Sequence, residues 1–271
     1  MQVVRINSLD DSRLDVFRDL KNSNAKRDDG LFIAEGTTLV ERLLHSSWTV
    51  KVVLASEQKL RNFRSRIPPG TLVYEVSRDL ASELVGYRFH LGVVAAAQRR
   101  RQPSLDEWLA AAPHGLVLLG EHIIDPENVG LLIRIAAAFG ASGIVLTHGS
   151  ADAFSRRVLR VSMGNGLSLP VIEDAAAGDA LAAFVRHGYD CFATVLEAEA
   201  EPLASVQFPD RTVIVVGNET HGVSDKVAMF CRRKVTIPMY NGTDSLNVSI
   251  AAGIFCHQYR AQYPDLEESR A

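Results

Sequence analysis

The residues most able to do chemistry lie in residues 235–253, where an apolar run ends at Pro238 and a polar loop leads into a second apolar stretch. The loop consists of turn-forming residues, and either Asp244 or Ser245 could cap a helix over residues 246–262. A strand, a tight loop and a helix N-terminus that meet in this way present unpaired backbone N–H groups, which suit a carboxylate or a phosphate. The alternative is an ordinary strand–loop–helix unit in which Ser245 is a plain N-cap.

A second polar cluster interrupts the apolar stretch of residues 121–147. Asn128 and Arg134 lie six residues apart in a segment with helical spacing. An unpaired buried charge is costly, so we expect Arg134 to have a partner. The alternative is a surface arginine whose stem lies along apolar neighbours while its guanidinium reaches water.

The third cluster follows the apolar run of residues 212–216, which opens into Gly217, Asn218 and Glu219. A glycine at this point allows the backbone to approach a ligand closely. Glu219 could orient a hydroxyl or pair with an arginine. The alternatives are a plain strand-to-loop glycine and a solvated carboxylate, which is the commoner environment for glutamate.

Several common catalytic motifs are missing from the sequence. It contains no GxxxxGK[ST], GxGxxG, GxSxG or HExxH pattern, which argues against P-loop enzymes, dinucleotide-dependent dehydrogenases, α/β-hydrolases and zinc proteases. The 3 cysteines are odd in number and lack CxxC spacing, so we expect reduced thiols and no metal site.

The elements that must position these clusters indicate two α/β domains. We expect a small α/β domain over residues 1–98, a linker over 99–113, a second domain over 114–264 and a polar tail over 265–271. The expected strands are 31–34, 50–54, 72–76, 92–97, 116–119, 143–146, 190–195, 212–216 and 235–237. The expected helices are 36–45, 57–66, 80–85, 105–112, 129–139, 154–162, 175–187, 224–230 and 246–262. The later strands are continuous apolar runs, which is typical of a parallel sheet covered on both faces.

Composition is that of an ordinary globular chain. The 271 residues are 47% hydrophobic and 23% charged, with a formal net charge of −3. That charge argues against a protein that coats nucleic acid by bulk electrostatics, although local basic patches remain possible. No apolar run is long enough to span a membrane and the N-terminus lacks a signal-peptide core, so we expect a cytoplasmic protein with no membrane partner.

Taken together, the three clusters resemble the signature of the SpoU/TrmH family of RNA 2′-O-ribose methyltransferases, in the SPOUT superfamily. The matching segments are NVGLLIR (128–134), VVGNETHGV (215–223) and IPMYNGTDSLNVSIAAG (237–253). The intervening RVSMGNGLSLP (160–170) also resembles the family's small-residue segment between the first and second motifs. The first domain is similar to the family's substrate-binding domain through FIAEG (32–36) and HLGVVA (90–95).

The resemblance implies a SPOUT domain with a parallel sheet and a deep trefoil knot, preceded by the small α/β RNA-binding domain. It implies S-adenosylmethionine as cofactor and a homodimer formed through the knotted domain. The cofactor-binding residues would be Gly217, Asn218, Ile237, Met239, Leu246, Thr194 and Leu196. The catalytic residues would be Arg134, Asn128, Glu219, Ser245 and Asn247.

In this family the arginine that matches Arg134 is assigned to activating the ribose hydroxyl. A guanidinium stays protonated, so two roles remain open: a proton acceptor in an unusual environment, or a cation that holds phosphate and alkoxide. Asn128, Glu219, Ser245 and Asn247 would orient Arg134 and the ribose.

The expected substrate is structured RNA, ribosomal more than transfer RNA, and not DNA. The basic side chains that could hold it are Lys26, Arg27, Arg99, Arg100, Arg101, Arg156, Arg157 and Arg160. The alternative for each is a solvated charged face. Two other functions stay open, a SPOUT base-nitrogen methyltransferase and a catalytically silent RNA-binding or ribosome-assembly factor. The sequence does not separate a housekeeping role from antibiotic resistance.

Overall fold

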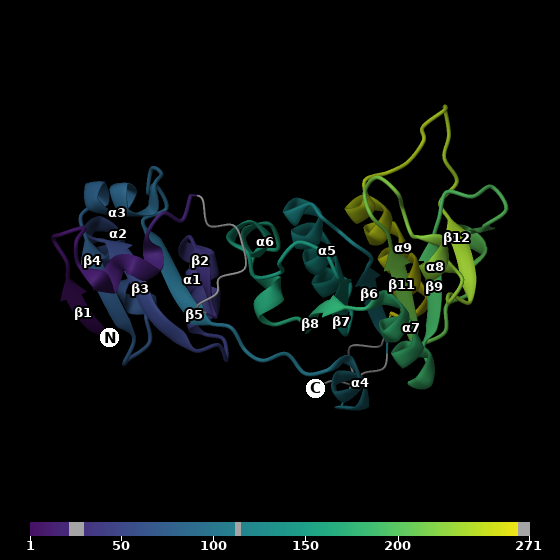
Figure 1. The fold of residues 1–271 in the computed structure, drawn as a ribbon, viewed down its shortest axis with the longest axis horizontal. Coiled ribbons are helices and arrows are strands. Elements are labelled where there is room, and N and C mark those ends of the chain that lie inside the picture. The colour runs from purple at the N-terminus through teal and green to yellow at the C-terminus, as the bar shows by residue number, and fades with distance from the viewer. Residues whose placement is uncertain (22–29, 112–114, 265–271) are drawn as a thin grey trace. The chain divides into compact units, whose positions relative to one another are not determined.

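The computed structural model describes residues 1–21, 30–111 and 115–264 (Figure 1). The chain forms two compact units. Unit 1 combines Met1–Arg101 with Phe154–Ser168, and unit 2 combines Gln102–Ala153 with the chain from Leu169 onward. The return of Phe154–Ser168 to unit 1 was not expected from the sequence, which placed residues 114–264 in one domain.

Unit 1 is built on a mixed five-stranded sheet. Its strands in spatial order are β1 (Gln2–Arg5), β4 (Leu72–Val76), β3 (Val50–Ser56), β5 (Val93–Gln98) and β2 (Leu31–Glu35). The first three are parallel, whereas β5 runs antiparallel to both of its neighbours. The α-helices of this unit are α1 (Thr37–Leu44), α2 (Glu57–Phe63), α3 (Arg78–Val85) and α6 (Arg156–Val161).

The segment Phe154–Ser168 supplies part of the unit 1 core. The ring of Phe154 packs against those of Phe32 and Trp48, with centroids 5.5 and 5.1 Å away. The Arg156 guanidinium donates to the Glu35 carboxylate at 3.1 Å and to the Tyr87 hydroxyl at 2.9 Å. The Glu35 side chain is only 3% exposed, so this ion pair lies in the interior.

Unit 2 is built on a seven-stranded sheet in which every paired strand is parallel. In spatial order the strands are β10 (Glu201–Pro202), β12 (Arg233–Thr236), β9 (Asp190–Thr194), β11 (Thr212–Val216), β6 (Leu116–Gly120), β7 (Gly143–Thr147) and β8 (Val171–Ala175). Its helices are α4 (Leu105–Ala111), α5 (Pro126–Ala138), α7 (Ala177–Arg186), α8 (Asp225–Ala228) and α9 (Val248–Gln262). The prediction of a parallel sheet is confirmed for this unit.

Strands β6, β7 and β11 are buried along their whole length, as their continuous apolar sequences indicate. Helices α5 and α9 pack against each other beside this sheet (Figure 1). Among the residues that the structure describes, no helix is long and apolar enough to cross a membrane.

Three strands were not expected, and several helix starts differ from the prediction by two or three residues. The edge strands β1, β8 and β10 were not expected, because they are short and their pattern is not clearly apolar. Helix α5 begins at Pro126 rather than near residue 129, since Asp125 caps it and proline suits the first helical position. Helix α9 begins at Val248 with Asn247 as its cap, so the proposed caps Asp244 and Ser245 are wrong.

Candidate functional site

Four neighbouring strands of unit 2 end at one edge of the sheet. The register aligns Val216 of β11 with Gly120 of β6, and Val235 of β12 with Thr194 of β9. All four strands are parallel, so the loops that follow them emerge on the same side. The carboxyl ends of strands in an open parallel sheet are the usual place for a ligand.

At this edge, Gly217 lies against the backbone of its own loop. A Cβ atom built on Gly217 would lie 2.0 Å from the carbonyl carbon of Gly222 and from the nitrogen of Val223. The loop folds back because Asn218 and Gly222 exchange backbone hydrogen bonds of 3.0 and 2.8 Å. Only glycine fits at position 217, and its role in the structure is this close backbone crossing.

Asn128 lies at the centre of a hydrogen-bonded cluster that joins the three sequence motifs. Its Nδ2 donates to Glu219 Oε1 at 3.0 Å, and its Oδ1 accepts from Asn247 Nδ2 at 2.9 Å. The hydroxyl of Ser249 donates to the backbone oxygen of Asn128 at 3.3 Å. Asn128 is 5% exposed, so these bonds fix its amide in one orientation.

Glu219 binds the start of α5 through its carboxylate. Besides the amide of Asn128, it accepts from the backbone N–H of Asp125 at 3.1 Å and of Ile124 at 3.4 Å. Partial burial raises the pKa of this carboxyl, but the hydrogen bonds from Asn128 and from backbone N–H groups outweigh it, so the net shift is downward. Glu219 is therefore ionised at neutral pH and acts as an acceptor and an anchor.

Asn247 connects the cluster to α9. Its Oδ1 accepts from the N–H of Ser249 at 2.9 Å and of Ile250 at 3.4 Å, while its Nδ2 donates to Asn128. The helix N-terminus predicted in this region is therefore present, but it is occupied by Asn247. Ser245 is exposed in the preceding loop, and no hydrogen bond within the described residues links its side chain to the cluster.

Arg134 lies outside the hydrogen-bonded cluster. It is exposed on α5, and within the described parts of the chain its side chain has no hydrogen bond or ion pair. Six residues of helix rotate it by about 120° from Asn128 and move it about 9 Å along the axis. The expectation of a partner inside the protein is not met, and the alternative of a surface arginine describes its position.

The other predicted cofactor residues flank the same edge of the sheet. The half-buried ones are Thr194, Ile237, Met239 and Leu246. Leu196 is 62% exposed. Asn218 has a different role, because its side chain shapes the loop. It donates to the backbone oxygen of His122 at 2.9 Å and accepts from the N–H of Thr220 at 2.9 Å.

Two residues of the site were missed by the sequence analysis. Ser249 was given no role by the sequence analysis, yet its hydroxyl donates to the backbone oxygen of Asn128. Glu121 accepts from the N–H of Ser224 at 2.8 Å and from its hydroxyl at 2.6 Å, which ties the β6 edge to the start of α8. Neither has a sequence signal beyond its place beside a predicted motif.

The predicted RNA-contacting side chains fall into different environments. Lys26 and Arg27 lie outside the described residues. Arg156 is engaged in the interior ion pair with Glu35, which leaves its guanidinium little access to a phosphate. The guanidinium of Arg99 lies 5.6 Å from the Phe154 ring and that of Arg100 4.6 Å from the Trp48 ring. The remaining three, Arg101, Arg157 and Arg160, are exposed.

The fold and this cluster define an α/β protein with a hydrogen-bonded polar cluster at the carboxyl edge of a parallel sheet. Residues 115–257 match the SpoU rRNA Methylase family, and residues 13–88 match the MRM3-like substrate binding domain. The chain belongs to the SpoU rRNA methylase family, which confirms the resemblance seen in its motifs.

Known relatives align over most of the chain. A protein of Mycobacterium bovis named as an uncharacterised tRNA/rRNA methyltransferase is 34% identical, over 90% of this chain and 87% of its own. The 23S rRNA (guanosine(2553)-2′-O)-methyltransferase RlmP of Bacillus subtilis is 28% identical over 94% and 99%. The crystal structure of an AdoMet-bound rRNA methyltransferase from Sinorhizobium meliloti superposes with a TM-score of 0.83 at 26% identity, over 97% of this chain and 99% of that one.

Proposed function

We propose that this protein transfers the methyl group of S-adenosylmethionine to a ribose 2′-hydroxyl of RNA, with ribosomal RNA favoured over transfer RNA. The observation that carries the proposal is the Asn128 cluster, in which hydrogen bonds join all three family motifs at one edge of the sheet. The match to the SpoU family and the 2′-O activity named for the Bacillus relative support the same reaction.

The residues at the sheet edge fit S-adenosylmethionine. The side chains of Ile237, Met239 and Leu246 are half-buried and apolar, which suits an adenine ring, and the loop at Gly217 offers backbone groups beside them. The cofactor supplies an electrophilic methyl on a sulfonium. The protein's part is to bind it, to exclude water and to present the ribose hydroxyl in line.

The Asn128 cluster keeps the three loops in fixed positions around the reacting groups. Glu219 stays ionised and holds the start of α5, and Asn247 holds the start of α9. Preorganised polar groups of this kind lower the barrier because they need not reorient during the reaction. We assign Asn128, Glu219 and Asn247 to positioning the site, with Ser245 in the adjacent exposed loop as a contact to substrate.

Arg134 is the cation we assign to the substrate. Its exposed guanidinium is held by no described residue, so it is free to bind a phosphate or a developing alkoxide with paired N–H groups. Of the two roles considered for it, this exposed position favours the electrostatic clamp, which needs only a cation with paired N–H donors facing the substrate.

The proposal includes a homodimer formed through α9 and a knotted C-terminal segment. On α9, Ile250 and Ile254 are 56% and 38% exposed, an apolar face that a second copy would cover. After β12, near one edge of the sheet, the chain returns to the cluster through Asn247, and α9 packs against α5. That long return is the path that a threaded loop requires.

The test is methyl transfer by the purified chain. It is incubated with labelled S-adenosylmethionine and unmodified ribosomal or transfer RNA, and the RNA is digested to nucleosides. Label in a 2′-O-methylnucleoside of ribosomal RNA is expected. Label on a base would overturn the ribose chemistry, and the absence of both label and cofactor binding would favour a silent RNA-binding factor.

A further inference from the structure

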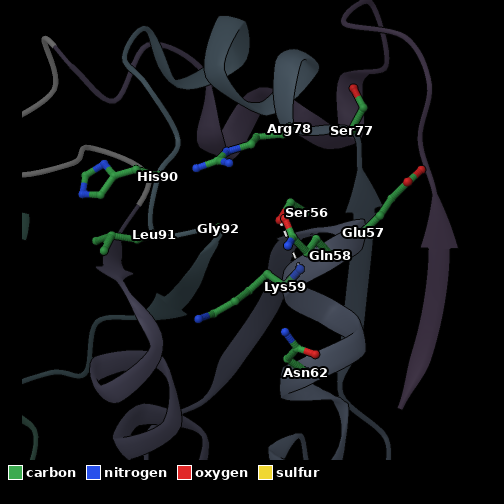
Figure 2. Close-up of a pocket in the computed structure, with 10 residues that line it drawn as sticks. All are labelled: Ser56, Glu57, Gln58, Lys59, Asn62, Ser77, Arg78, His90, Leu91 and Gly92. Atoms are coloured by element: carbon green, nitrogen blue, oxygen red, sulfur yellow. Dashed lines mark hydrogen bonds between the residues drawn. The ribbon is translucent and has the colours of Figure 1, made fainter.

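Unit 1 contains a pocket of about 340 Å³ at the carboxyl ends of β3 and β4 (Figure 2). It is lined by the first residues of α2, the start of α3 and the loop that precedes β5. All of its lining residues belong to unit 1, so the pocket is separate from the cluster around Asn128.

The lining side chains are rich in positive charge and in hydrogen-bond donors. Lys59, Arg78 and His90 extend toward the same side of the pocket in Figure 2. Its single carboxylate is that of Glu57, which points away from them and forms an ion pair with Arg5. The charge that faces the pocket is therefore positive.

Neither Lys59 nor Arg78 has an ion pair with another residue that the structure describes. Two cations that face one space repel each other, and an anion placed between them removes that repulsion. Some exposed arginines of this unit do have an acid partner, as Arg18 has Asp15 at 2.9 Å and Arg66 has Glu41 at 3.0 Å. Within the described residues no acid pairs with Lys59 or Arg78, which suits a ligand that brings its own negative charge.

Gly92 forms a tightly fitted wall of the pocket. Its φ angle is +72°, and a Cβ atom built there would lie 3.0 Å from the Cβ of Lys59 and 3.1 Å from the hydroxyl oxygen of Ser56. Its carbonyl accepts from the N–H of Ser56 at 3.0 Å. Because Gly92 has no side chain, the Cβ of Lys59 can lie directly against this loop. The close packing fixes the position from which the Lys59 side chain extends into the pocket.

We propose that this pocket binds backbone phosphates of the substrate RNA, as a contact independent of base sequence. Small-molecule pockets are mostly apolar, whereas here Leu91 is the single aliphatic side chain among polar ones. Arg78, His90 and Asn62 are exposed, so the pocket is open and a chain can pass across it. The inference rests on the proposed function, which makes the ligand RNA.

The test compares two double variants of the full chain that remove the same charge. Lys59→Gln with Arg78→Gln changes the pocket, and Arg61→Gln with Arg64→Gln changes exposed arginines of the same region that do not line it. The Kd for an unmodified large-subunit ribosomal RNA transcript is measured from about 50 to 200 mM salt. We expect the pocket variant to bind roughly tenfold more weakly than the control, with a salt slope smaller by about 1 to 2.

A second probe separates charge from shape. A single-stranded RNA oligonucleotide with uncharged methylphosphonate linkages is expected to bind wild type and the pocket variant equally, while its normal counterpart distinguishes them. Equal Kd values and salt slopes for the two double variants would overturn the proposal. Thermal unfolding and S-adenosylmethionine affinity should match wild type in both, since the changed side chains lie at the surface of unit 1.

The failure of this proposal is distinguishable from failure of the proposed function. If wild type transfers methyl groups but the change at Lys59 and Arg78 does not alter the RNA affinity, only the pocket proposal is lost. If wild type transfers none, yet RNA affinity depends on these two residues, the pocket stands and the methyltransferase function is lost.

Discussion

Asn128 forms hydrogen bonds through both the nitrogen and the oxygen of its side-chain amide, so one neighbour must accept and the other must donate. The Nδ2 end faces the carboxylate of Glu219 and the Oδ1 end faces the amide of Asn247. The arrangement depends on Glu219 being ionised, because a protonated carboxyl would offer a donor where Asn128 and two backbone N–H groups already donate.

The lowered pKa of Glu219 predicts a pH dependence. Its stabilising contribution is complete above the ordinary glutamate value of about 4.3 and is lost as pH falls through the lower folded value. Glu219→Gln should therefore be less stable than wild type at pH 7, and the gap should narrow as pH falls below the ordinary glutamate pKa toward the lower folded pKa. Urea unfolding at several pH values measures this. A gap of constant size from neutral to acid pH would contradict it.

Arg134→Lys tests the clamp. Lysine keeps the charge but cannot form two parallel hydrogen bonds, so we expect kcat to fall by roughly 100-fold. Because Arg134 is exposed, the free energy of unfolding of the Arg134→Lys protein should differ from that of wild type by less than about 0.5 kcal/mol. Arg61→Lys, an exposed change in unit 1, is the control and should retain activity. Full activity in Arg134→Lys would remove this residue from the chemistry.

Among the elements, the loop after β11 is the most constrained, because two backbone segments cross at Gly217. The crossing fixes the loop that carries Asn218 and Glu219, and thereby the anchor of α5. No rotamer change could make space for a side chain at this position, because the atoms around it belong to the backbone.

Gly217→Ala should therefore destabilise the protein by roughly 3 kcal/mol or more and weaken S-adenosylmethionine binding. Gly178→Ala is the matched control, because nothing lies within 4 Å of its added Cβ on α7. That control should be neutral or stabilising by up to about 1 kcal/mol. Calorimetric titration of the cofactor and thermal unfolding check both, and a Gly217→Ala protein as stable as the control would refute the crossing.

Much of the element order could be predicted, because long buried strands such as β6, β7 and β11 are unbroken apolar runs. The close approach at Gly217 was anticipated, but its partner is the loop's own backbone, and nothing in the spacing of Gly217 and Gly222 reveals that. The cap at Asn247 was missed because Asp, Ser and Asn are all good caps and four candidates lie in one loop. The isolation of Arg134 on α5 could not be predicted either, since burial depends on which face of the helix packs on the sheet.

At the scale of the molecule, unit 1 is assembled from two separate pieces of the chain. The interior ion pair between Glu35 and Arg156 joins them, and Trp48 donates to the carbonyl oxygen of Leu167 at 2.9 Å. Both contacts lie within unit 1, so they stabilise that unit itself.

Glu35→Gln leaves the Arg156 guanidinium without its counter-charge in a buried position. We expect a loss of about 3 kcal/mol in unfolding free energy. Glu57→Gln removes an exposed pair with Arg5 and should cost less than about 1 kcal/mol. Denaturant unfolding of the full chain compares them. Equal losses in the two variants would argue against a structural role for the interior pair.

The proposed dimer predicts that a charge on α9 yields a monomer. Ile250→Glu, at a position that is 56% exposed, should halve the mass measured by light scattering while leaving the fold intact. Val185→Glu, at an equally exposed position on α7, is the control and should keep the mass of wild type. A dimer that survives the change at Ile250 would place the interface elsewhere.

The insertion of Phe154–Ser168 into unit 1 also bears on how such chains can be recombined in evolution or in the laboratory. A gene fragment that ends at residue 101 encodes a first unit without Phe154 and Arg156, so it cannot be exchanged between relatives as a self-contained cassette. A functional chimaera must carry both stretches from one parent, or must match Glu35 and Phe32 to the residues of the other. The two units of this protein are therefore expected to be inherited together.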